Sequence, residues 1–549
     1  MLGLMQQHAL LLSSIIEHAA RHHGAAEVVS IGTDGSVHRT DYATTERRAR
    51  RLLTVLEYSL GVRSGDRVAT LAWNGYRHLE LYYGISGLGA VCHTVNPRLA
   101  PDDIAYIMNH AEDGVVFADL SFVPLLSELV PRVQSLRAVV LLCEATELPS
   151  LDLPGGVALH AYEALMEAVD ETAAWPVFDE GTASALCYTS GTTGRPKGVL
   201  YSHRSAVLHA YASNMGDVFG LRATERVLLA ASMFHATGWA LPYCAPMAGA
   251  ALILPGRHLD GASLAQLLNA ERATFSGGVP TIWLGVLQHM QETGARPETL
   301  RRLLIAGSSC PRVLIEGFGA WGVDVHQAWG MTETSPLVTY HGPVPATAAL
   351  SHEEDVRLRL KQGRAAFGAD IKIVDAEGRE LPRDGKAFGD LLARGHWVAR
   401  EYLHSGSEGA ADAEGWFRTG DVATIDPNGY AEMIDRSKDV IKSGGEWISS
   451  IALENIAVSH PDVAEAAIIG ARHLKWMERT LLLVVPKPGR TVNTEALLAL
   501  YDGQVAKWWL PDAVVIVEEL PHTATGKLNK LALRARWQDH LVRASEAAG

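Results

Sequence analysis

Cysteine is scarce in this chain, and its spacing offers no cross-link. Five cysteines are scattered over 549 residues, and none stands in a Cys-x-x-Cys pair. The odd count and wide spacing argue against a disulfide framework and against a structural zinc site. We therefore expect a protein of a reducing compartment, the cytoplasm.

Long hydrophobic runs and basic clusters are also missing. No uninterrupted apolar run reaches the ~20 residues of a membrane span. The first 21 residues contain Glu17 and lack both a basic segment and a small-residue cleavage site, so a signal peptide is not expected. The 62 acidic residues outnumber the 48 basic ones, and the formal net charge is −14, which disfavours nucleic-acid binding. We expect a soluble protein without an integral membrane segment or a nucleic-acid partner.

Length and apolar content are what the chain does have. It is 549 residues long and 48% hydrophobic. That length exceeds what one compact domain usually contains, so we expect at least two domains. Apolar runs typical of buried strands alternate with helix-like segments such as 42–60 and 262–273. The alternation predicts an α/β fold with mainly parallel sheets. The strand-like runs are 67–72, 114–118, 138–142 and 250–254.

The C-terminal part of the chain has a different pattern. Glycine, aspartate and proline gather at 375–389 and 426–429 and predict hairpin turns in a more β-rich region. A polar, lysine-rich turn at 435–438 is followed by a helix-like stretch and by short strands at 464–470 and 480–485. We therefore place a domain boundary at that turn.

Glycines, hydroxyls and one lysine are concentrated in residues 188–199, which read Tyr-Thr-Ser-Gly-Thr-Thr-Gly-Arg-Pro-Lys-Gly-Val. Glycines let backbone N–H groups converge on an anion, and Lys197 adds a mobile positive charge. The segment is not a Walker A loop, because Lys197 follows Pro196 and precedes Gly198. A simple turn between two strands is the alternative, but the composition of all twelve residues favours a loop that binds a nucleoside triphosphate.

This loop resembles the phosphate loop of the adenylate-forming superfamily, which contains acyl-CoA synthetases, firefly luciferase and the adenylation domains of peptide synthetases. Further segments resemble that superfamily's motifs and follow in the same order almost to the C-terminus. Each is weak alone, but their collinearity is very specific. They are 201–204 (Tyr-Ser-His-Arg), 234–239 (Phe-His-Ala-Thr-Gly-Trp), 306–311 (Ala-Gly-Ser-Ser-Cys-Pro), 329–334 (Trp-Gly-Met-Thr-Glu-Thr), 417–421 (Phe-Arg-Thr-Gly-Asp), 435–439 (Asp-Arg-Ser-Lys-Asp) and 521–527 (Pro-His-Thr-Ala-Thr-Gly-Lys).

The resemblance implies an architecture and a reaction. A large N-terminal domain of mainly parallel sheets with a β-rich subdomain would span residues 1–434, followed by a hinge at 435–442 and a small, mobile α+β lid at 443–549. The acid would attack the α-phosphate of ATP to give acyl-AMP and pyrophosphate, and the thiol of CoA would then displace AMP. Because the first step concentrates negative charge, it calls for Mg²⁺ and for cationic or N–H donors.

The resemblance also implies roles for the nucleotide-binding residues. Glu333 would hold Mg²⁺ with Thr189 as a hydroxyl partner, although a glutamate at a helix N-terminus can simply be stabilised by the dipole. Thr332 would meet the α-phosphate. Asp421 and Arg436 would contact the ribose, although a Thr-Gly-Asp sequence alone is most often a turn. The phosphate loop set is Thr189, Ser190, Gly191, Thr192, Thr193, Gly194 and Lys197, and the set around the adenine is Gly307, Ser308, Ser309, Gln327, Ala328, Trp329 and Gly330.

The lid would serve the two half-reactions with two faces. Lys527 resembles the lysine that bridges the acid and the α-phosphate during adenylation, although an isolated surface lysine is normally just solvated. After rotation about Lys438, the opposite face would line the thiol tunnel, where Gly444 and Gly445 allow close approach of the pantetheine arm. The residues expected on that second face are Lys442, Ser443, Gly444, Gly445, Glu446 and Trp447.

The acid substrate is indicated by residues 233–242, which resemble bacterial medium- and long-chain fatty acyl-CoA synthetases. His235 would position the substrate carboxylate, where amino-acid-activating relatives have an aspartate, although a lone histidine is more often a packed core residue. Trp239 would gate the acyl tunnel. The segment around Gly277, Gly278 and Val279 would leave space for an apolar chain.

We expect a medium-chain fatty acid as the substrate, with 3-methylmercaptopropionate, a short thioether acid, and arylalkanoates as open alternatives. No carrier-protein motif follows and the chain ends soon after Lys527, so free CoA is the expected acceptor. Two other functions are possible for the same motifs: a luciferase-like oxidation of the acyl-AMP, or a catalytically silent protein that only binds an acyl group or ATP. The joint presence of Glu333, Asp421, Arg436 and Lys527 argues against the silent one.

The apolar-rich segment 2–16 resembles the arm through which related synthetases dimerise. An exposed apolar helix would be a liability in a monomer. We therefore expect a homodimer.

Overall fold

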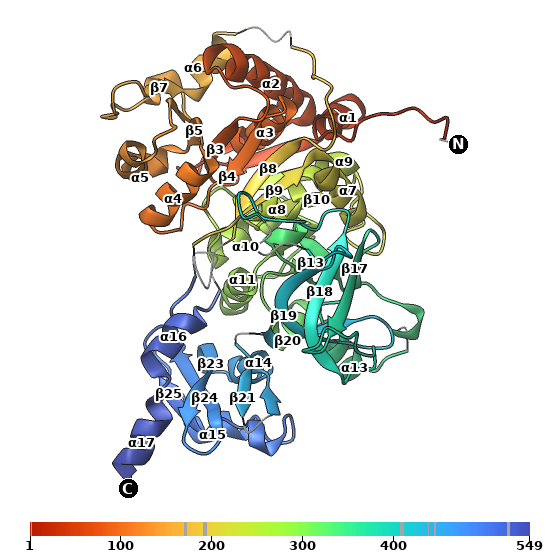
Figure 1. The fold of residues 1–549 in the computed structure, drawn as a ribbon, viewed down its shortest axis with the longest axis vertical. Helices are drawn as coiled ribbons and strands as arrows, with labels where there is room; N and C mark the ends of the chain where they lie inside the picture. The colour runs from red at the N-terminus through yellow and green to blue at the C-terminus, as the bar shows by residue number, and fades with distance from the viewer. Residues whose placement is uncertain are drawn as a thin grey trace.

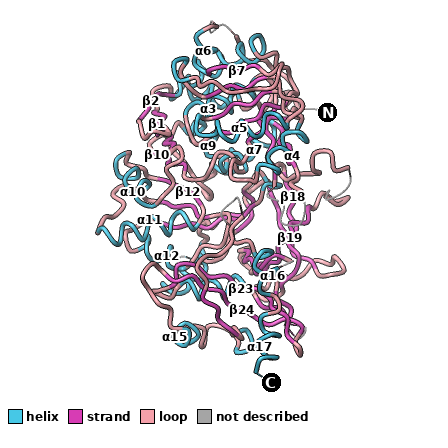
Figure 2. Tube along the Cα trace, turned by 90° about the vertical axis from the view of Figure 1, so that its left-hand side faces the viewer, coloured by secondary structure: helices cyan, strands magenta, loops and turns pink. Residues whose placement is uncertain are grey.

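The structure is a computed structural model that describes residues 1, 3–169, 173–189, 195–347, 349–406, 411–437, 439–443, 446–523 and 527–548. Figure 1 shows an elongated molecule in which the C-terminal elements form one end and the elements around β7 and α6 form the other. Figure 2 shows the same arrangement after a turn of 90°. The α/β class with large parallel sheets and a small C-terminal domain is confirmed. None of the helices within the described ranges is long and apolar enough to cross a bilayer.

A nine-stranded sheet forms the middle of the molecule, in the order β16-β15-β14-β13-β12-β10-β11-β1-β2. Its central strands from β14 to β1 are parallel, and the strands at both edges are antiparallel. The bounds are β1 (Glu27–Ile31), β2 (Val37–Asp41), β10 (Arg226–Leu229), β11 (Ala251–Leu254), β12 (Phe275–Gly278), β13 (Arg302–Ile305), β14 (Asp324–Gly330), β15 (Leu337–Tyr340) and β16 (Arg364–Ala365).

A seven-stranded sheet forms the N-terminal end, in the order β7-β6-β5-β3-β4-β8-β9. All neighbours are parallel except β9, which runs antiparallel to β8 and so frames the phosphate loop. The strands predicted at 67–72, 114–118, 138–142 and 250–254 are confirmed as β3, β5, β6 and β11. The bounds are β3 (Arg67–Leu71), β4 (Val91–Thr94), β5 (Val115–Ala118), β6 (Ala138–Leu141), β7 (Ala158–Ala161), β8 (Ala183–Tyr188) and β9 (Gly198–Ser202).

Helices pack on both sheets, and one continuous core joins them through residues such as Leu52, Tyr83 and Tyr243. The predicted helices at 42–60 and 262–273 are confirmed as α2, which continues into a π-helical turn at Val55–Ser59, and α10. The bounds are α1 (Ser13–His23), α2 (Tyr42–Thr54), α3 (Tyr76–Gly87), α4 (Pro101–Ala111), α5 (Val123–Leu129), α6 (Tyr162–Glu167), α7 (His203–Ser213), α8 (Ala236–Trp239), α9 (Leu241–Ala248), α10 (Gly261–Ala270), α11 (Pro280–Thr293), α12 (Arg312–Gly319) and α13 (His352–Arg359).

The N-terminal segment is not the exposed apolar helix that we expected. Helix α1 begins only at Ser13, and its apolar positions Ile15, Ile16 and Ala19 are buried against α2 and α9. Met1 and residues 3–8 are exposed and non-helical. The apolar face of α1 is covered by the chain itself. The homodimer stays a prediction without this support.

A four-stranded antiparallel sheet lies beside β14 and contains the hairpin turns predicted at 375–389 and 426–429. Its core residues Ile371, Leu391 and Ala423 pack with Trp329 of β14. This contact places β19 next to the end of the central sheet. The bounds are β17 (Ala369–Val374), β18 (Phe388–Gly395), β19 (Phe417–Ile425) and β20 (Ala431–Arg436).

The C-terminal residues form a small α+β unit with its own hydrophobic clusters. The strands predicted at 464–470 and 480–485 are confirmed within β23 and β24. The unit meets β20 through the start of α14, where the backbone N–H of Ser450 donates to Oδ2 of Asp435 at 2.9 Å. The bounds are β21 (Ile441–Ser443), β22 (Glu446–Ile448), β23 (Val463–His473), β24 (Met477–Pro486), β25 (Ala513–Ile516), α14 (Ser450–Val458), α15 (Thr494–Ala499), α16 (Lys530–Trp537) and α17 (His540–Ala548).

Candidate active site

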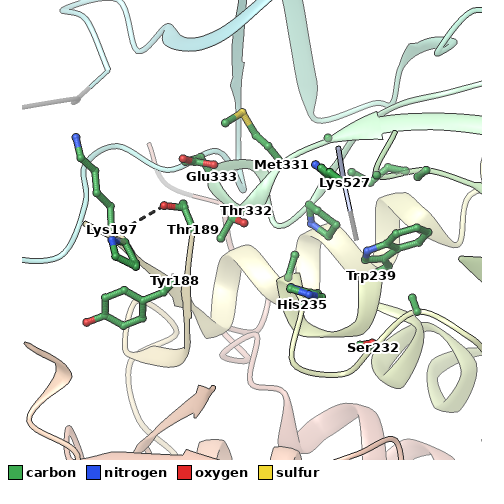
Figure 3. A pocket seen from close by; sticks show the side chains of 18 of the residues that line it. Tyr188, Thr189, Lys197, Ser232, His235, Trp239, Met331, Thr332, Glu333 and Lys527 are labelled. Carbon is green, nitrogen blue, oxygen red and sulfur yellow. Dashed lines mark hydrogen bonds between the residues drawn. The ribbon is translucent and has the colours of Figure 1, made fainter. Parts of the chain in front are cut away.

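A cavity of about 800 Å³ opens where the carboxyl ends of the parallel strands meet the C-terminal unit. Figure 3 shows Lys527, Thr332 and His235 around one space, with Lys197 and Thr189 on one side and Trp239 on the other. The predicted site residues that line it are Thr189, Lys197, His235, Trp239, Val279, Gly307, Ala328, Trp329, Gly330, Thr332, Glu333, Arg436 and Lys527. Segments far apart in the sequence therefore share one cavity.

A second cleft of about 340 Å³ lies between the same strands and the C-terminal unit. The predicted residues that line it are Gly307, Ser308, Ser309, Ala328, Trp329, Gly330, Asp421, Arg436 and Lys527. Because several residues line both spaces, the two are neighbouring parts of one site. The second cleft contains the residues that we expected to hold the nucleoside.

The phosphate end of the cavity is formed by the hairpin of β8 and β9. The backbone N–H of Lys197 points to the Thr189 hydroxyl at 3.3 Å, and the Thr189 N–H donates to the Lys197 carbonyl at 2.9 Å. The Lys197 ammonium lies 5.1 Å from the centre of the Tyr402 ring. The base of the loop is therefore closed by the backbone, and its lysine lies over an aromatic face. Ser190, Gly191, Thr192, Thr193 and Gly194 lie outside the described residues.

Glu333 is buried beside this phosphate end. Its Oε1 accepts a hydrogen bond of 2.6 Å from the Tyr402 hydroxyl, and burial raises the pKa of its carboxyl group. Its backbone is fixed as well, because the Ala399 N–H donates to its carbonyl at 2.7 Å and the Tyr201 hydroxyl donates to the Thr332 carbonyl at 2.6 Å. Glu333 lies in a single 3₁₀ turn rather than in the first turn of an α-helix.

The chemistry of Glu333 suits a magnesium ion that arrives with a nucleotide. Mg²⁺ commonly takes one or two protein carboxylates and completes its shell with phosphate oxygens and water. Within the described ranges no group of three or more His, Cys, Asp or Glu side chains gathers to hold a metal. A single buried carboxylate facing a phosphate-binding loop fits a magnesium ion that is bound by one protein carboxylate, phosphate oxygens and water. Thr189 lines the same cavity.

The nucleoside end is organised around the buried carboxylate of Asp421. The indole Nε1 of Trp329 donates to its Oδ2 at 2.8 Å, and the guanidinium of Arg436 lies 3.0 Å from its Oδ1. Gln327 does not line either space. Its amide instead accepts from the Cys310 N–H at 2.7 Å and donates to the Leu360 carbonyl at 2.7 Å, so it fixes the segment that we expected to surround the adenine.

His235 and Lys527 meet at the reaction centre. The Nε2 of His235 is buried without a hydrogen-bond partner among the described residues. Burial lowers the pKa of His235 to about 3, helped by the nearby cations Arg98 and Lys527, so its imidazole is neutral near pH 7. Burial and Arg436 lower the pKa of Lys527 to about 8, against the opposing effect of Asp421 and Glu333. The lysine is thus a charged donor close to its titration point.

Trp239 is positioned by a left-handed turn. Residues 236–240 all have positive φ, including 44° at Thr237, 57° at Trp239 and 61° at Ala240. This conformation costs an L-residue other than glycine about 1–2 kcal/mol. A Cβ placed on Gly307 would lie 3.6 Å from Cζ2 of Trp239. The strained turn therefore places the indole against Gly307, between the nucleotide segment and the apolar part of the cavity.

Ser443 is the one residue expected on the second face of the lid whose side chain the structure describes, and it lines neither space. Ser443 pairs with Met477 in the C-terminal sheet and accepts from Nη1 of Arg479 at 3.3 Å. Gly277 and Gly278, in β12, are also outside the lining. Lys438, Gly444 and Gly445 lie outside the described residues, as do the side chains of Lys442, Glu446 and Trp447. In this arrangement the C-terminal unit therefore presents Lys527 to the cavity.

Tyr402 and Arg98 are among the cavity residues that the sequence reasoning missed. Tyr402 donates a hydrogen bond to Glu333, but the two residues are far apart in the sequence, and only the fold shows that they meet. Arg98 lines the cavity from the loop after β4, and its guanidinium lies 5.9 Å from the centre of the Phe234 ring. No carboxylate in the described part of the chain pairs with it, and burial lowers its pKa. A single arginine in a loop has no spacing that would have revealed it.

Comparison with known proteins agrees with this geometry. Residues 16–403 match the family described as AMP-binding enzyme, and residues 452–527 match the AMP-binding enzyme C-terminal domain. The chain is 49% identical to the 3-methylmercaptopropionyl-CoA ligase of Ruegeria lacuscaerulensis, over 99% of this chain and 100% of that protein. It is 47% identical to the medium-chain-fatty-acid–CoA ligase of Ectopseudomonas oleovorans, over 100% of both.

More distant likenesses extend the same result. The chain is 44% identical to the long-chain-fatty-acid–CoA ligase of Thermus thermophilus, over 98% of this chain and 97% of that protein. The crystal structure of the anthranilate CoA ligase AuaEII with anthranoyl-AMP superposes with a TM-score of 0.84 at 23% identity, over 96% and 98% of the two chains. At that identity the likeness concerns the fold alone.

The fold and the site define an adenylate-forming enzyme. The chain belongs to the AMP-binding enzyme family, and within it the chain lies among the acid–CoA ligases. The expected superfamily membership is thereby confirmed.

Proposed function

We propose that this protein is an ATP- and Mg²⁺-dependent acid–CoA ligase that activates a medium-chain fatty acid. The observation that supports this most is the meeting of Lys527 with His235, Thr332 and Glu333 in one cavity. Such a set places a cation, a neutral imidazole, a hydroxyl and a metal-binding carboxylate around one reacting carboxylate. The ligase relatives of this chain support the same reaction type.

In the first half-reaction a carboxylate oxygen of the acid attacks the α-phosphorus of ATP. The bond to the bridging oxygen breaks, and pyrophosphate leaves with its electron pair. The unpartnered Nε2 of His235 is available to orient the acid. Lys527 neutralises the charge that develops on the α-phosphate, while Thr189 and Lys197 hold the departing phosphates. Glu333, with Thr189, would hold Mg²⁺, which supplies further charge neutralisation when bound.

In the second half-reaction the thiol of CoA attacks the acyl carbon and AMP leaves. This step requires the C-terminal unit to present its other face. We assign residues 1–434 to the N-terminal domain, 435–442 to the hinge and 443–549 to the lid, with rotation about Lys438. Residues 442–447 would then approach the pantetheine arm. Ser443 lines neither cavity in the present arrangement, which is consistent with such a two-state lid.

The choice of acid rests on the apolar part of the cavity, which Val279, Ile282 and Leu304 line together with Trp239. It suits a straight alkyl chain. A short thioether acid is the competing substrate, because the relatives at 49% and 47% identity bear names for these two different acids. A pyrophosphate-release screen over acids of increasing length, with and without CoA, tests the assignment. Release with 3-methylmercaptopropionate but with no medium-chain acid would overturn it.

The assembly and location complete the proposal. We infer a homodimer from the family resemblance of segment 2–16 alone, because the apolar face of α1 is covered within the chain. We infer a cytoplasmic location from five cysteines that are all buried and unpaired. Light scattering at micromolar protein tests the assembly. A mass near the 59.2 kDa of one chain would refute the dimer.

A further inference from the structure

One aromatic side chain in the wall of the main cavity is fully buried. Phe219 follows α7 in the connection to β10 and lines the cavity, yet it has 0% of its surface exposed. Val279, Ile282 and Trp239 line the same cavity closer to Gly307 and are only half-buried. Phe219 packs on Phe275, the first residue of β12, whereas Gly307 follows the carboxyl end of the neighbouring parallel strand β13, so Phe219 lines the cavity at the end far from Gly307.

The Phe219 ring rests on other aromatic rings that leave it little freedom to retreat. Its centroid lies 5.7 Å from that of Phe275 and 6.0 Å from that of Tyr340. The guanidinium of Arg302 lies 5.2 Å from the centre of the Phe275 ring. Both partner rings are buried. A ring packed in this way is a fixed wall on the time-average, because protein interiors are close-packed.

The backbone of Phe219 is fixed too. Its N–H donates to the Ser213 carbonyl at 2.8 Å, and its own carbonyl accepts from Nη1 of Arg302. Arg302 is in turn held by Glu225, with Nη2 2.9 Å from Oε1. The loop that bears Phe219 is therefore anchored at both its amide and its carbonyl, and the charge of Arg302 is already neutralised by a carboxylate.

The surroundings of Phe219 within the cavity are apolar. Ala230, Leu304 and Leu337 line the cavity and are buried. A group that ends here meets these apolar side chains and the Phe219 ring, so a methyl terminus is favoured and a charged or hydroxylated terminus would lose its hydrogen bonds with water. This end of the cavity thus distinguishes acids by the length of their acyl chain and by the polarity of its terminus.

We propose that Phe219 sets the upper limit of acyl-chain length, which rests on the proposed ligase function and names a specificity-determining residue for it. The chain enters past Trp239 and Val279, and its methyl end stops against the Phe219 ring. Trp239 and Phe219 have separate roles, since Trp239 lies beside the chain against Gly307 whereas Phe219 lies across its end. An acid too long for the space must bend or leave its carboxylate short of Lys527.

The test is the kcat/KM profile of wild type and Phe219→Ala for homologous straight-chain acids and for homologous ω-methylthio acids. Removing the ring opens space toward Phe275 and Tyr340. The quantity to compare is kcat/KM for the acid one methylene longer than the wild-type optimum, divided by kcat/KM for the optimal acid. We expect this ratio to be roughly tenfold higher or more in Phe219→Ala, since one methylene in an apolar pocket is worth about 10–200-fold. Phe219→Leu, which keeps more packing, should shift the ratio in the same direction by less.

Phe318→Ala is the matched control, because Phe318 is equally buried but belongs to a different cluster and does not line the cavity. It should lower stability without changing the ratio. Parallel profiles for wild type, Phe219→Ala and Phe219→Leu would overturn the proposal while leaving the ligase function intact. Wild-type inactivity toward every member of both series would contradict the proposed activation of a fatty acid itself, so this failure can be told apart from a failure of the Phe219 proposal.

Discussion

Nε1 of Trp329 donates a hydrogen bond of 2.8 Å to Oδ2 of Asp421. The bond joins the end of β14 to β19 and orients a buried carboxylate toward the cleft where the ribose of ATP would lie. Arg436 occupies the other oxygen of the same carboxylate. The indole and the guanidinium together fix Asp421 before any nucleotide arrives.

Trp329→Phe removes that donor and keeps an aromatic face. We expect KM for ATP to rise by roughly tenfold, because a hydrogen bond to a charged group contributes about 1.5–3 kcal/mol. Steady-state kinetics at saturating acid measure the effect. Trp175→Phe is the control, since its Nε1 donates to Oε1 of Glu46 at 2.9 Å away from the cavity. An unchanged KM for ATP would show that the hydrogen bond from Trp329 to Asp421 does not contribute to nucleotide binding.

Lys527→Ala should slow acyl-AMP formation by roughly a hundredfold or more, the scale of losing one preorganised donor to a transition state. Thioester formation from supplied acyl-AMP should largely survive, because that step uses the other face of the lid. Lys487→Ala, on the same unit but away from both linings, is the control. Equal loss of both half-reactions would show that Lys527 acts through folding or in both states.

The pH dependence of adenylation should follow Lys527. Its pKa of about 8 lies below the ordinary value for lysine because of burial and Arg436. As the pH rises through about 8, the ammonium loses its charge, and kcat/KM for acyl-AMP formation should fall. Lys527→Arg keeps its charge at these pH values and should remove the decline. A decline at the same pH in Lys527→Arg would assign it to another group.

Trp239→Ala tests the wall of the acyl pocket. If the indole obstructs entry, longer acids should gain in kcat/KM relative to shorter ones. If it only packs, the loss should be uniform over chain length and accompanied by about 3–5 kcal/mol of lost stability. Thermal unfolding is therefore measured first. Because Phe219 closes the end of the pocket, the shift in Trp239→Ala should stop at the same maximum length as in the wild type.

Several features of the fold followed directly from the sequence. Apolar runs such as 138–142 formed parallel strands because both faces of the sheet are covered, and turn residues at 426–429 formed a hairpin. The ordered motifs indicated segments that the fold then brought to one cavity, as with Thr332 and Lys527. These features depend on local composition and on motif order, which are visible in one dimension.

Other features depend on contacts that periodicity does not report. The apolar face of α1 was expected to be exposed, but α2 and α9 cover it. Gln327 was expected near the adenine, whereas its amide is used to fix Cys310. The left-handed turn that places Trp239 includes four residues other than glycine, and no local propensity favours that conformation. Tyr402, which hydrogen-bonds Glu333, comes from a loop in another part of the chain.

The most direct test of the account is product analysis of a reaction containing ATP, Mg²⁺, CoA and octanoate. Mass spectrometry should show AMP and octanoyl-CoA in equal amounts, with pyrophosphate and with acyl-AMP when CoA is left out. Formation of ADP and orthophosphate in place of AMP and pyrophosphate would contradict the account, because it would place the attack on the γ-phosphate rather than on the α-phosphate beside Lys527.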